Sequence, residues 1–232
     1  MIVGSGMLAR TFKAAYAHRE DVCIYAAGVS NSGCTDRREF SRERLRLEKA
    51  IKQAMDVSAF VYFGTCSIAD PEAQDTPYVK HKLAMEQLVA AHSHYLILRL
   101  PQVAGITPNP HTLLNYLYVR IVRSERFSLW CRAKRNIIDV DDVASIAQHL
   151  IANQSQRNMT INIANAFNYP MEEIIKTLGQ VVGKNPLYDS VDRGSNYLID
   201  INDISPFLDK ANVKFDNTYL ERVLKKYYQK RL

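Results

Sequence analysis

Short apolar runs alternate with longer amphipathic segments along nearly the whole chain of 232 residues. The short runs predict strands near residues 1–3, 22–27, 57–63, 95–100 and 159–163. The longer segments predict helices near residues 6–18, 37–55, 77–92, 111–124, 141–153, 170–183 and 217–229. Because strands that alternate with helices of these lengths form a parallel sheet covered on both faces, the sequence predicts a doubly wound α/β fold.

The first predicted strand runs directly into a glycine-rich turn. Residues 4–9 read GSGMLA, a GxGxxA pattern, and the first predicted helix follows. Such a turn lets a phosphate approach backbone amides at the N-terminus of a helix. The pattern is a weak signal when it stands alone, so its weight depends on the motifs that follow it.

A tyrosine and a lysine stand four residues apart at the start of another predicted helix. Helical spacing places Tyr78 and Lys82 on one face. A free tyrosine has a pKa of about 10, and a nearby ammonium favours the phenolate and lowers that pKa towards neutral pH. The strand at 57–63 leads into Thr65, and open α/β sheets bind ligands at the carboxyl ends of their strands. We therefore expect Thr65 to lie across from Tyr78.

In this chain order the motifs resemble the short-chain dehydrogenase/reductase superfamily, in particular its extended branch of nucleotide-sugar epimerases, dehydratases and reductases. The segment 25–29 (YAAGV) resembles the strand end that lines the cofactor ribose. Residues 98–105 (LRLPQVAG) resemble the strand and loop that reach from the nicotinamide to the substrate. Residues 135–144 (RNIIDVDDVA) resemble the family's Arg-Asp-Phe-Ile-His-Val-x-Asp-Val-Ala block, with Asp139 where a histidine is usual.

The resemblance implies hydride transfer with NAD or NADP, which the sequence does not distinguish. Tyr78 would exchange the proton of a sugar hydroxyl, Lys82 would hold the cofactor ribose and lower the pKa of Tyr78, and Thr65 would hydrogen-bond the reacting oxygen. The implied cofactor contacts are Gly4, Ser5, Gly6, Met7, Leu8, Ala26, Ala27, Gly28, Thr65, Tyr78, Lys82, Pro101 and Val103. The implied substrate contacts are Ser67, Gln102 and Arg135, with Arg135 as a clamp on the diphosphate. Arg10 could meet a 2′-phosphate, but an arginine on a helix face is more often solvated.

We interpret residues 1–232 as a single unit of this type. Residues 1–105 and 137–165 would form mainly the nucleotide-binding core, and residues 106–136 and 166–232 mainly a small substrate-binding cap. The stretch Ile106 to Pro110 is rich in proline and asparagine, so it predicts a loop on the substrate side. Asp141 is expected to be a helix N-cap and Asp142 a favourable first-turn charge.

The region after the first helix departs from the usual dinucleotide fold. That fold has two further strands before the Ala-Ala-Gly strand, and an acidic residue that ends its second strand. Only residues 14–21 separate the later turns of the first helix from the strand at 22–27, so the second and third strands are predicted to be missing. The alternative is that residues 22–27 are the second strand. With the deletion, strand 1–3 becomes an edge, which a symmetric partner or the chain's own tail would shield. A homodimer could equally use helices 37–55 and 77–92.

Composition narrows the class of protein further. The net charge of +6 and the basic tail at 225–231 suggest nucleic acid, but an enzyme of anionic nucleotides gains equally from a positive field, so no nucleic-acid partner is expected. No apolar run approaches the ~20 residues of a membrane span, and strand one leaves no room for a signal peptide. The four cysteines show no metal spacing, and they suit a reducing cytoplasm.

These observations predict an NAD(P)-dependent oxidoreductase or epimerase that acts on a nucleotide-linked keto sugar, in surface polysaccharide biosynthesis and in the cytoplasm. Thr65 is followed by Cys66 and Ser67 rather than by an acidic pair, which argues against 4,6-dehydration. The alternative is a degenerate relative that binds a nucleotide or a partner enzyme without turnover. The missing strands favour this alternative, whereas the complete set of Thr65, Tyr78 and Lys82 opposes it.

Overall fold

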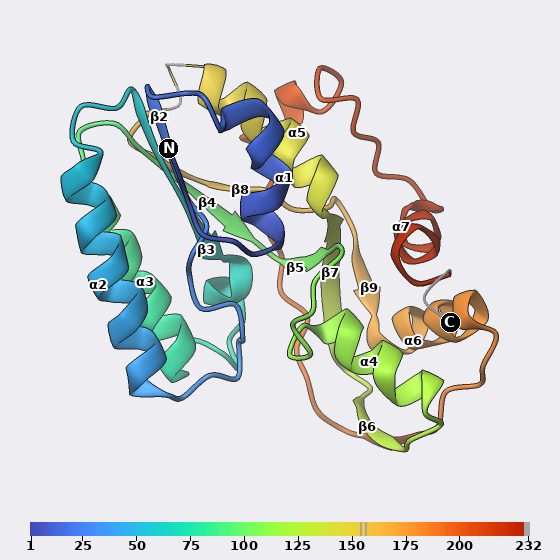
Figure 1. Cartoon of the computed structure of the whole chain (residues 1–232). Helices are drawn as coiled ribbons and strands as arrows, with labels where there is room; N and C mark the ends of the chain where they lie inside the picture. Colours follow the sequence, from blue (N-terminus) through green and yellow to red (C-terminus); the bar gives the residue numbers. More distant parts are fainter. Residues whose placement is uncertain (154, 156, 230–232) are drawn as a thin grey trace.

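A five-stranded parallel sheet forms the centre of the molecule (Figure 1). The computed structural model describes residues 1–153, 155 and 157–229. The strands of the sheet are β1 (Ile2–Val3), β2 (Val22–Tyr25), β3 (Ala59–Thr65), β4 (Tyr95–Leu100) and β8 (Met159–Asn162). Each of them lies where the apolar runs predicted it, and the inner strands β2, β3 and β4 are mostly apolar and bury both of their faces.

Helices cover both faces of this sheet, as the alternating pattern predicts. Helices α1 (Met7–Tyr16) and α5 (Val140–Ala152) pack on one face, and α2 (Arg37–Gln53) and α3 (Pro77–Val89) lie side by side on the other (Figure 1). A separate hydrophobic core fills the space between the sheet and each pair of helices. Successive residues of β2 point into one core and then the other, since Ile24 packs with α1 and α5, and Tyr25 packs with α2 and α3. The doubly wound fold is therefore confirmed.

The order of the strands is β1-β2-β3-β4-β8, which makes β1 an edge. Ile2 pairs with Ile24 in parallel register, and β2 also pairs with β3. In the usual dinucleotide fold the second strand lies outside the first one, away from the rest of the sheet. Here the strand Val22–Tyr25 lies inside β1, so the predicted loss of two strands is confirmed and the alternative assignment of this strand is wrong.

A second lobe follows the sheet along the chain. It contains β5 (Gln102–Ala104), β7 (Lys134–Asp139) and β9 (Asn168–Pro170) in one small sheet, and β6 (Phe127–Trp130) paired with β10 (Tyr188–Val191) in another. Helices α4 (Leu113–Val122), α6 (Met171–Val182) and α7 (Tyr219–Tyr228) enclose its core. The segment 201–215, which includes the short 3-10 helix Ser205–Phe207, packs back onto the first core. The division into core and cap at the expected residues remains a prediction.

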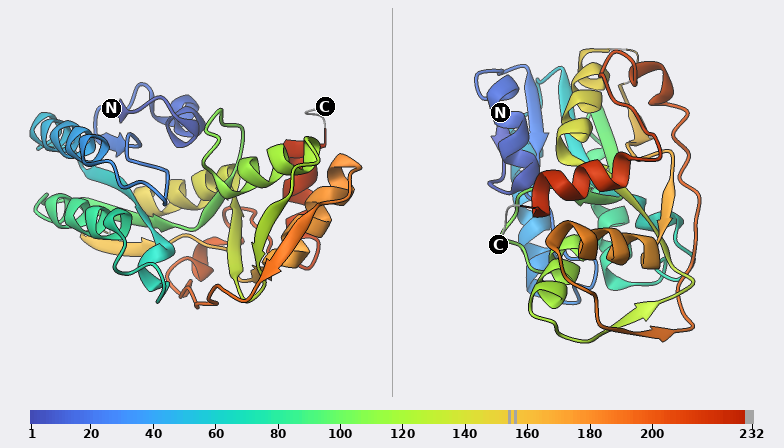
Figure 2. Two further views of the ribbon diagram at one scale, coloured as in Figure 1. Left: turned by 90° about the horizontal axis from the view of Figure 1, so that it is seen from below. Right: turned by 90° about the vertical axis from the view of Figure 1, so that its right-hand side faces the viewer.

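The C-terminal helix does not shield the edge at β1. Helix α7 packs against α6 and β7 in the second lobe, and Figure 2 shows both helices at the end of the molecule away from α2. The expectation that the described part of the tail covers this edge is wrong, because Leu220, Val223 and Leu224 bury their apolar face in the second core instead. The tail residues Lys230 and Arg231 lie outside the described residues.

A buried carboxylate fastens α7 to the start of α5. Asp139 Oδ1 accepts hydrogen bonds from Tyr227 Oη (2.5 Å) and from the Asp141 amide (2.9 Å), and Asp139 Oδ2 accepts from Lys226 Nζ (2.7 Å). Asp139 is thus the N-cap of α5, and the expectation that Asp141 caps it is wrong. The helix begins one residue earlier than predicted, which moves Asp141 into the first turn.

Asp139→Ala should therefore lower the free energy of unfolding by about 2–4 kcal/mol, because it removes a cap and leaves buried donors without an acceptor. Urea denaturation measures the change. Asp141→Ala is the matched control, since its exposed side chain also pairs with Lys226 and should contribute less than about 1 kcal/mol. Equal losses in the two variants would show that Asp139 does not anchor the helix.

Candidate active site

A cavity of about 510 Å³ opens at the carboxyl ends of the central strands. Its walls come from the glycine turn, from the ends of β2, β3 and β4, from α3, and from the loops at 28–32 and 107–112. The loop predicted on the substrate side thus contributes Thr107, Pro108 and Asn109. Asn109 Nδ2 donates to Ser30 Oγ at 3.0 Å, which joins the two loops. This is where an open α/β sheet is expected to bind a ligand.

The glycine turn has the geometry that a phosphate requires. Gly4 has a φ of +128°, and a Cβ atom there would lie 2.4 Å from the Ala26 carbonyl oxygen, so only glycine fits. Ser5, Gly6, Met7 and Leu8 line the cavity. Gly6 is the N-cap of α1 and has no side chain to cap it, and within the described residues the amides of Gly6 and Met7 donate to no protein group. The turn therefore fits the diphosphate of a dinucleotide.

The three candidate catalytic side chains meet at one wall of the cavity. Thr65 ends β3, and Tyr78 lies in the first turn of α3, which Thr76 caps and Pro77 begins. The Thr65 hydroxyl lies near enough to the Tyr78 phenol to lower its pKa. Tyr78 and Lys82 share a face of α3, as their spacing predicts. One substrate oxygen placed beside Thr65 and Tyr78 would reach both hydroxyls.

The charge around Lys82 differs from the expectation. Its Nζ atom donates to the Phe63 carbonyl oxygen at 3.0 Å and to Glu43 Oε1 at 3.3 Å, and it lies 4.4 Å from the centre of the Tyr62 ring. Burial lowers the pKa of Lys82, and the negative charge of Glu43 opposes that change. Burial would raise the pKa of Glu43, but the charge of Lys82 and several hydrogen bonds lower it to about 2.

The pKa of Tyr78 is raised, not lowered. The pKa of Tyr78 is raised to about 12, chiefly by burial and further by the charge of Glu43, while the nearby Thr65 hydroxyl lowers it in part. The sequence predicted the opposite direction from Lys82 alone. The main reason for the difference is the burial of Tyr78, which disfavours the charged phenolate, and the carboxylate of Glu43 on α2 raises the pKa further.

The remaining predicted residues fall into two groups. Ala26, Gly28, Pro101, Val103, Ser67 and Gln102 line the cavity. Ala27 packs against the core under α2 and α3, and Arg135 lies outside the cavity lining, where its NH1 group donates to the backbone oxygens of Lys134 and Ser195. Ser67 lies near Tyr197, whose pKa it lowers. The structure therefore does not bring Arg135 to the wall that Ser67 and Gln102 share.

Arg10, which the sequence favoured as a solvated arginine, lines the cavity, with its guanidinium bonded to the backbone oxygens of Ser5 (3.1 Å) and Ile106 (2.8 Å). Several other residues of the site were not identified from the sequence. Ser30 and Ser32, from the loop that follows β2, also line the cavity. Glu43 was also missed, although a signal existed. It shares the apolar face of α2 with Leu47 and Ala50, where a charged residue needs a buried partner.

Among the described residues, the lining of the cavity includes the basic residues Arg10 and Lys82 but no aspartate or glutamate, and Lys82 is paired with Glu43 behind the wall. A site of this charge favours an anionic ligand. No group of three or more histidines, cysteines, aspartates or glutamates suited to a metal ion occurs in the described part of the chain. Over the same residues, no helix combines the length and apolarity needed to cross a membrane.

Comparison with known proteins relates this fold and cavity to one family. The model of the NAD dependent epimerase/dehydratase family matches residues 8–164. None of the curated proteins matches the chain significantly. RMD from Pseudomonas aeruginosa, complexed with NADPH, superposes with a TM-score of 0.74 at 16% identity, covering 100% of this chain and 98% of that one.

Two further solved structures share the fold at low identity. UDP-glucuronic acid 4-epimerase from Bacillus cereus, in complex with UDP-glucuronic acid and NAD, gives a TM-score of 0.72 at 16% identity over 96% of this chain and 77% of that one. dTDP-glucose 4,6-dehydratase from Bacillus anthracis, in complex with NAD, gives a TM-score of 0.70 at 14% identity. The match covers 90% of this chain and 71% of that one. These likenesses agree with the predicted fold and with the expected NAD or NADP cofactor.

Proposed function

Because the chain belongs to the NAD-dependent epimerase/dehydratase family, we propose that it is an NAD(P)-dependent reductase or epimerase of a nucleotide-linked keto sugar. The main support for the proposal is that the phosphate-binding turn and the candidate catalytic side chains line the same cavity. The glycine turn, Thr65, Tyr78 and Lys82 all face that cavity, so a dinucleotide on the turn would reach the catalytic side chains.

The residues of the cavity have separate roles in this proposal. The amides of Gly6 and Met7 hold the diphosphate, and Ala26 and Gly28 contact the ribose. Lys82 holds the ribose hydroxyls, while Pro101 and Val103 contact the nicotinamide. When bound, the cofactor supplies the hydride chemistry. Because its pKa lies at about 12, Tyr78 is protonated at neutral pH, and its O–H is placed to give a proton to a carbonyl oxygen that Thr65 also hydrogen-bonds.

Substrate contacts are proposed on the open side of the cavity. Ser67 and Gln102 line it there, and the loop residues Thr107 and Asn109 extend the same wall. Arg135 as a clamp on the diphosphate requires a movement of its side chain away from Ser195, and this role stays a prediction. The residues after Thr65 are Cys66 and Ser67, so the site offers no acidic pair for 4,6-dehydration.

Binding and turnover assays test the proposal directly. NADH and NADPH are titrated by fluorescence, and the protein is then screened against UDP-, GDP-, CDP- and dTDP-linked keto sugars. We expect micromolar affinity for one of the two nucleotides and turnover of at least one sugar. If neither nucleotide binds below millimolar concentration, with or without a nucleotide sugar, the alternative of a degenerate relative is correct.

The missing strands specifically favour that alternative, because the adenosine side keeps only the loop at 28–32 and Arg10. A symmetric partner that covers β1 would complete this side. We propose a homodimer, located in the cytoplasm and serving surface polysaccharide biosynthesis. Sedimentation at micromolar concentration tests the first of these points, and a clean monomer would contradict it.

A further inference from the structure

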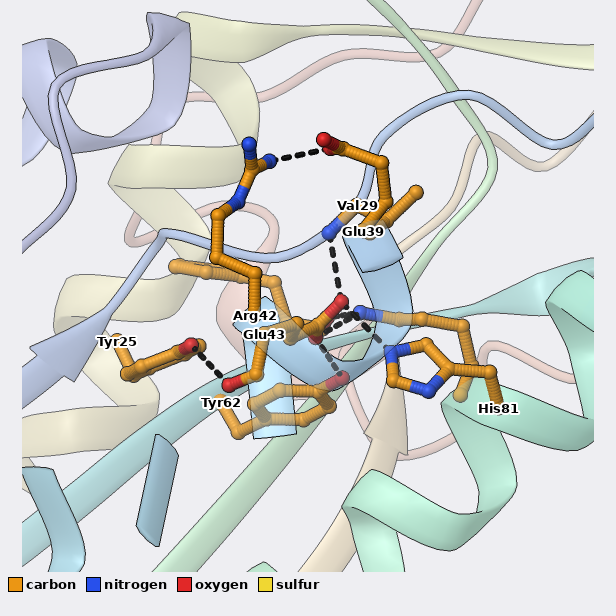
Figure 3. A network of polar contacts seen from close by, with 9 residues as sticks. Tyr25, Val29, Glu39, Arg42, Glu43, Tyr62 and His81 are labelled. Carbon is orange, nitrogen blue, oxygen red and sulfur yellow. Dashed lines mark hydrogen bonds and ion pairs between the residues drawn. The ribbon is translucent and has the colours of Figure 1, made fainter. Parts of the chain in front are cut away.

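Glu43 is a buried carboxylate that the proposed mechanism does not use. Its residue is 2% exposed, and it projects from α2 towards the catalytic helix α3. Figure 3 shows it at the centre of a group of donors. Glu43 Oε2 accepts from the Val29 amide at 2.6 Å and contacts His81 Nε2 at 2.9 Å, while Glu43 Oε1 accepts from Tyr62 Oη at 2.9 Å and from Lys82 Nζ at 3.3 Å. Each oxygen is thus fixed from two directions.

The ammonium of Lys82 depends on this carboxylate. Lys82 is 2% exposed, and a buried ammonium without a counter-ion loses its proton readily. Two of its three N–H groups are used, one on Glu43 and one on the Phe63 carbonyl oxygen. Lys82 also lines the cavity, so the third N–H is left for a ligand.

Gly28 lies directly over the ion pair. A Cβ atom on Gly28 would lie 2.8 Å from Glu43 Oε1 and 3.0 Å from Lys82 Nζ. This places the pair beneath the end of β2, at the point where the proposed function puts the cofactor ribose. Glu43 also holds the amide of Val29, the next residue of the loop that lines the adenosine side.

We propose that Glu43 is the positioning residue for Lys82: it pairs with the ammonium and aims one of its N–H groups at the ribose. The inference rests on the proposed function for the identity of the ligand. The pairing of Glu43 with Lys82 itself does not depend on it.

The consequence for chemistry follows from the charges that face the two groups. The charges that act on Lys82 are those of Glu43 from α2 and Glu86 from its own helix, and the Tyr62 ring of β3 lies beside it. His81 contacts the same Glu43 carboxylate, and Arg99 of β4 is paired to Glu86. Tyr78 meets Thr65, Cys66 and Glu43. Because Glu43 balances the charge of Lys82, no net positive charge stabilises the phenolate of the buried Tyr78. Tyr78 is therefore better suited to donate a proton than to remove one, which favours reduction of a ketone over oxidation of an alcohol near neutral pH.

A titration of Lys82 tests the pairing without any assay of activity. The protein is labelled with 13C at lysine Cε, and the Lys82 resonance is assigned by its loss in Lys82→Arg. Glu43→Gln should lower the pKa of Lys82 by about one unit or more, because the ammonium loses its counter-ion. Glu43→Asp, which retains the charge one methylene further back, should restore most of the difference.

Tyr62→Phe is the matched control, since it removes one hydrogen bond from Glu43 and keeps both the carboxylate and the ring beneath Lys82. It should change the pKa of Lys82 by less than about 0.3 unit. An unchanged pKa in Glu43→Gln would overturn the proposal. If Glu43→Gln does not fold, the titration of Lys82 in the native protein provides the test. A native Lys82 that is already neutral at pH 7.5 would overturn the proposal equally.

Nucleotide binding tests the second half of the proposal. At a pH between the Lys82 pKa values of the two proteins, Glu43→Gln should bind the preferred nucleotide about tenfold more weakly than the native protein, and the two affinities should converge at lower pH. Equal affinity at both pH values would overturn the positioning role. If the native protein binds neither NADH nor NADPH, the proposed function fails, whereas the titration of Lys82 still decides the pairing.

Discussion

Tyr78→Phe should lower turnover of a keto-sugar substrate by about 10²- to 10⁴-fold while nucleotide affinity stays within about twofold. The substitution removes only the phenolic oxygen of Tyr78, a residue that lies near Thr65 and lines the cavity. The ring is 8% exposed and retains its packing at the start of α3. Loss of a proton donor affects the chemical step, whereas the diphosphate and ribose contacts lie on other residues.

Steady-state kinetics and fluorescence titration on the same preparation separate the two effects. Tyr16→Phe is a suitable control, because Tyr16 is a buried tyrosine of α1 that does not line the cavity. It should leave kcat unchanged. Turnover by Tyr78→Phe at the native rate would reject the role assigned to Tyr78, even if nucleotide binding is confirmed.

Gly4→Ala should lower the free energy of unfolding by about 3 kcal/mol and abolish nucleotide binding at micromolar concentration. A side chain at a φ of +128° is strained, and its Cβ atom would lie 2.4 Å from the Ala26 carbonyl oxygen. Because Ala26 donates to Val3 across the β1–β2 pair, relief of this contact must move the turn or separate the strands. Either movement displaces the amides that would hold the diphosphate of the proposed nucleotide.

Thermal unfolding followed by circular dichroism measures the loss, which corresponds to a drop in Tm of about 6–12 °C for a chain of this size. Gly6→Ala provides the matched comparison, since no atom lies within 4 Å of a Cβ placed there. It should cost less than about 1 kcal/mol. A Tm of Gly4→Ala close to that of Gly6→Ala would mean that the turn does not need glycine at residue 4.

The central sheet could be predicted from the sequence because its signals are local. The run at 59–65 is apolar on both faces, and this pattern by itself predicts a strand that is buried on both sides. The spacing of Tyr78 and Lys82 is a property of one helix, and Thr76 with Pro77 marks where that helix begins. The missing strands could be inferred because too few residues separate α1 from β2 to contain them.

Contacts between distant segments could not be predicted in the same way. Asp139 is bonded by Lys226 and Tyr227, which lie 87 and 88 residues further along the chain. The destination of α7 follows from which apolar surface is nearest after folding, and its amphipathic pattern fits either lobe. Arg135 was assigned to the substrate by its place in a motif, yet its guanidinium is bonded to the Ser195 backbone oxygen from a segment that the motif does not include.

The sequence by itself determined the α/β architecture, the phosphate turn and the set of Thr65, Tyr78 and Lys82, because each depends on backbone preference or on spacing within one element. Only the tertiary structure decided which charged groups lie beside these three residues and how deeply they are buried. Packing of α2 against α3 brings Glu43 to Lys82 across 39 residues of sequence, at 3.3 Å. Since an electrostatic interaction depends on distance in space and on burial, the direction of the Tyr78 pKa could be known only after the helices were packed.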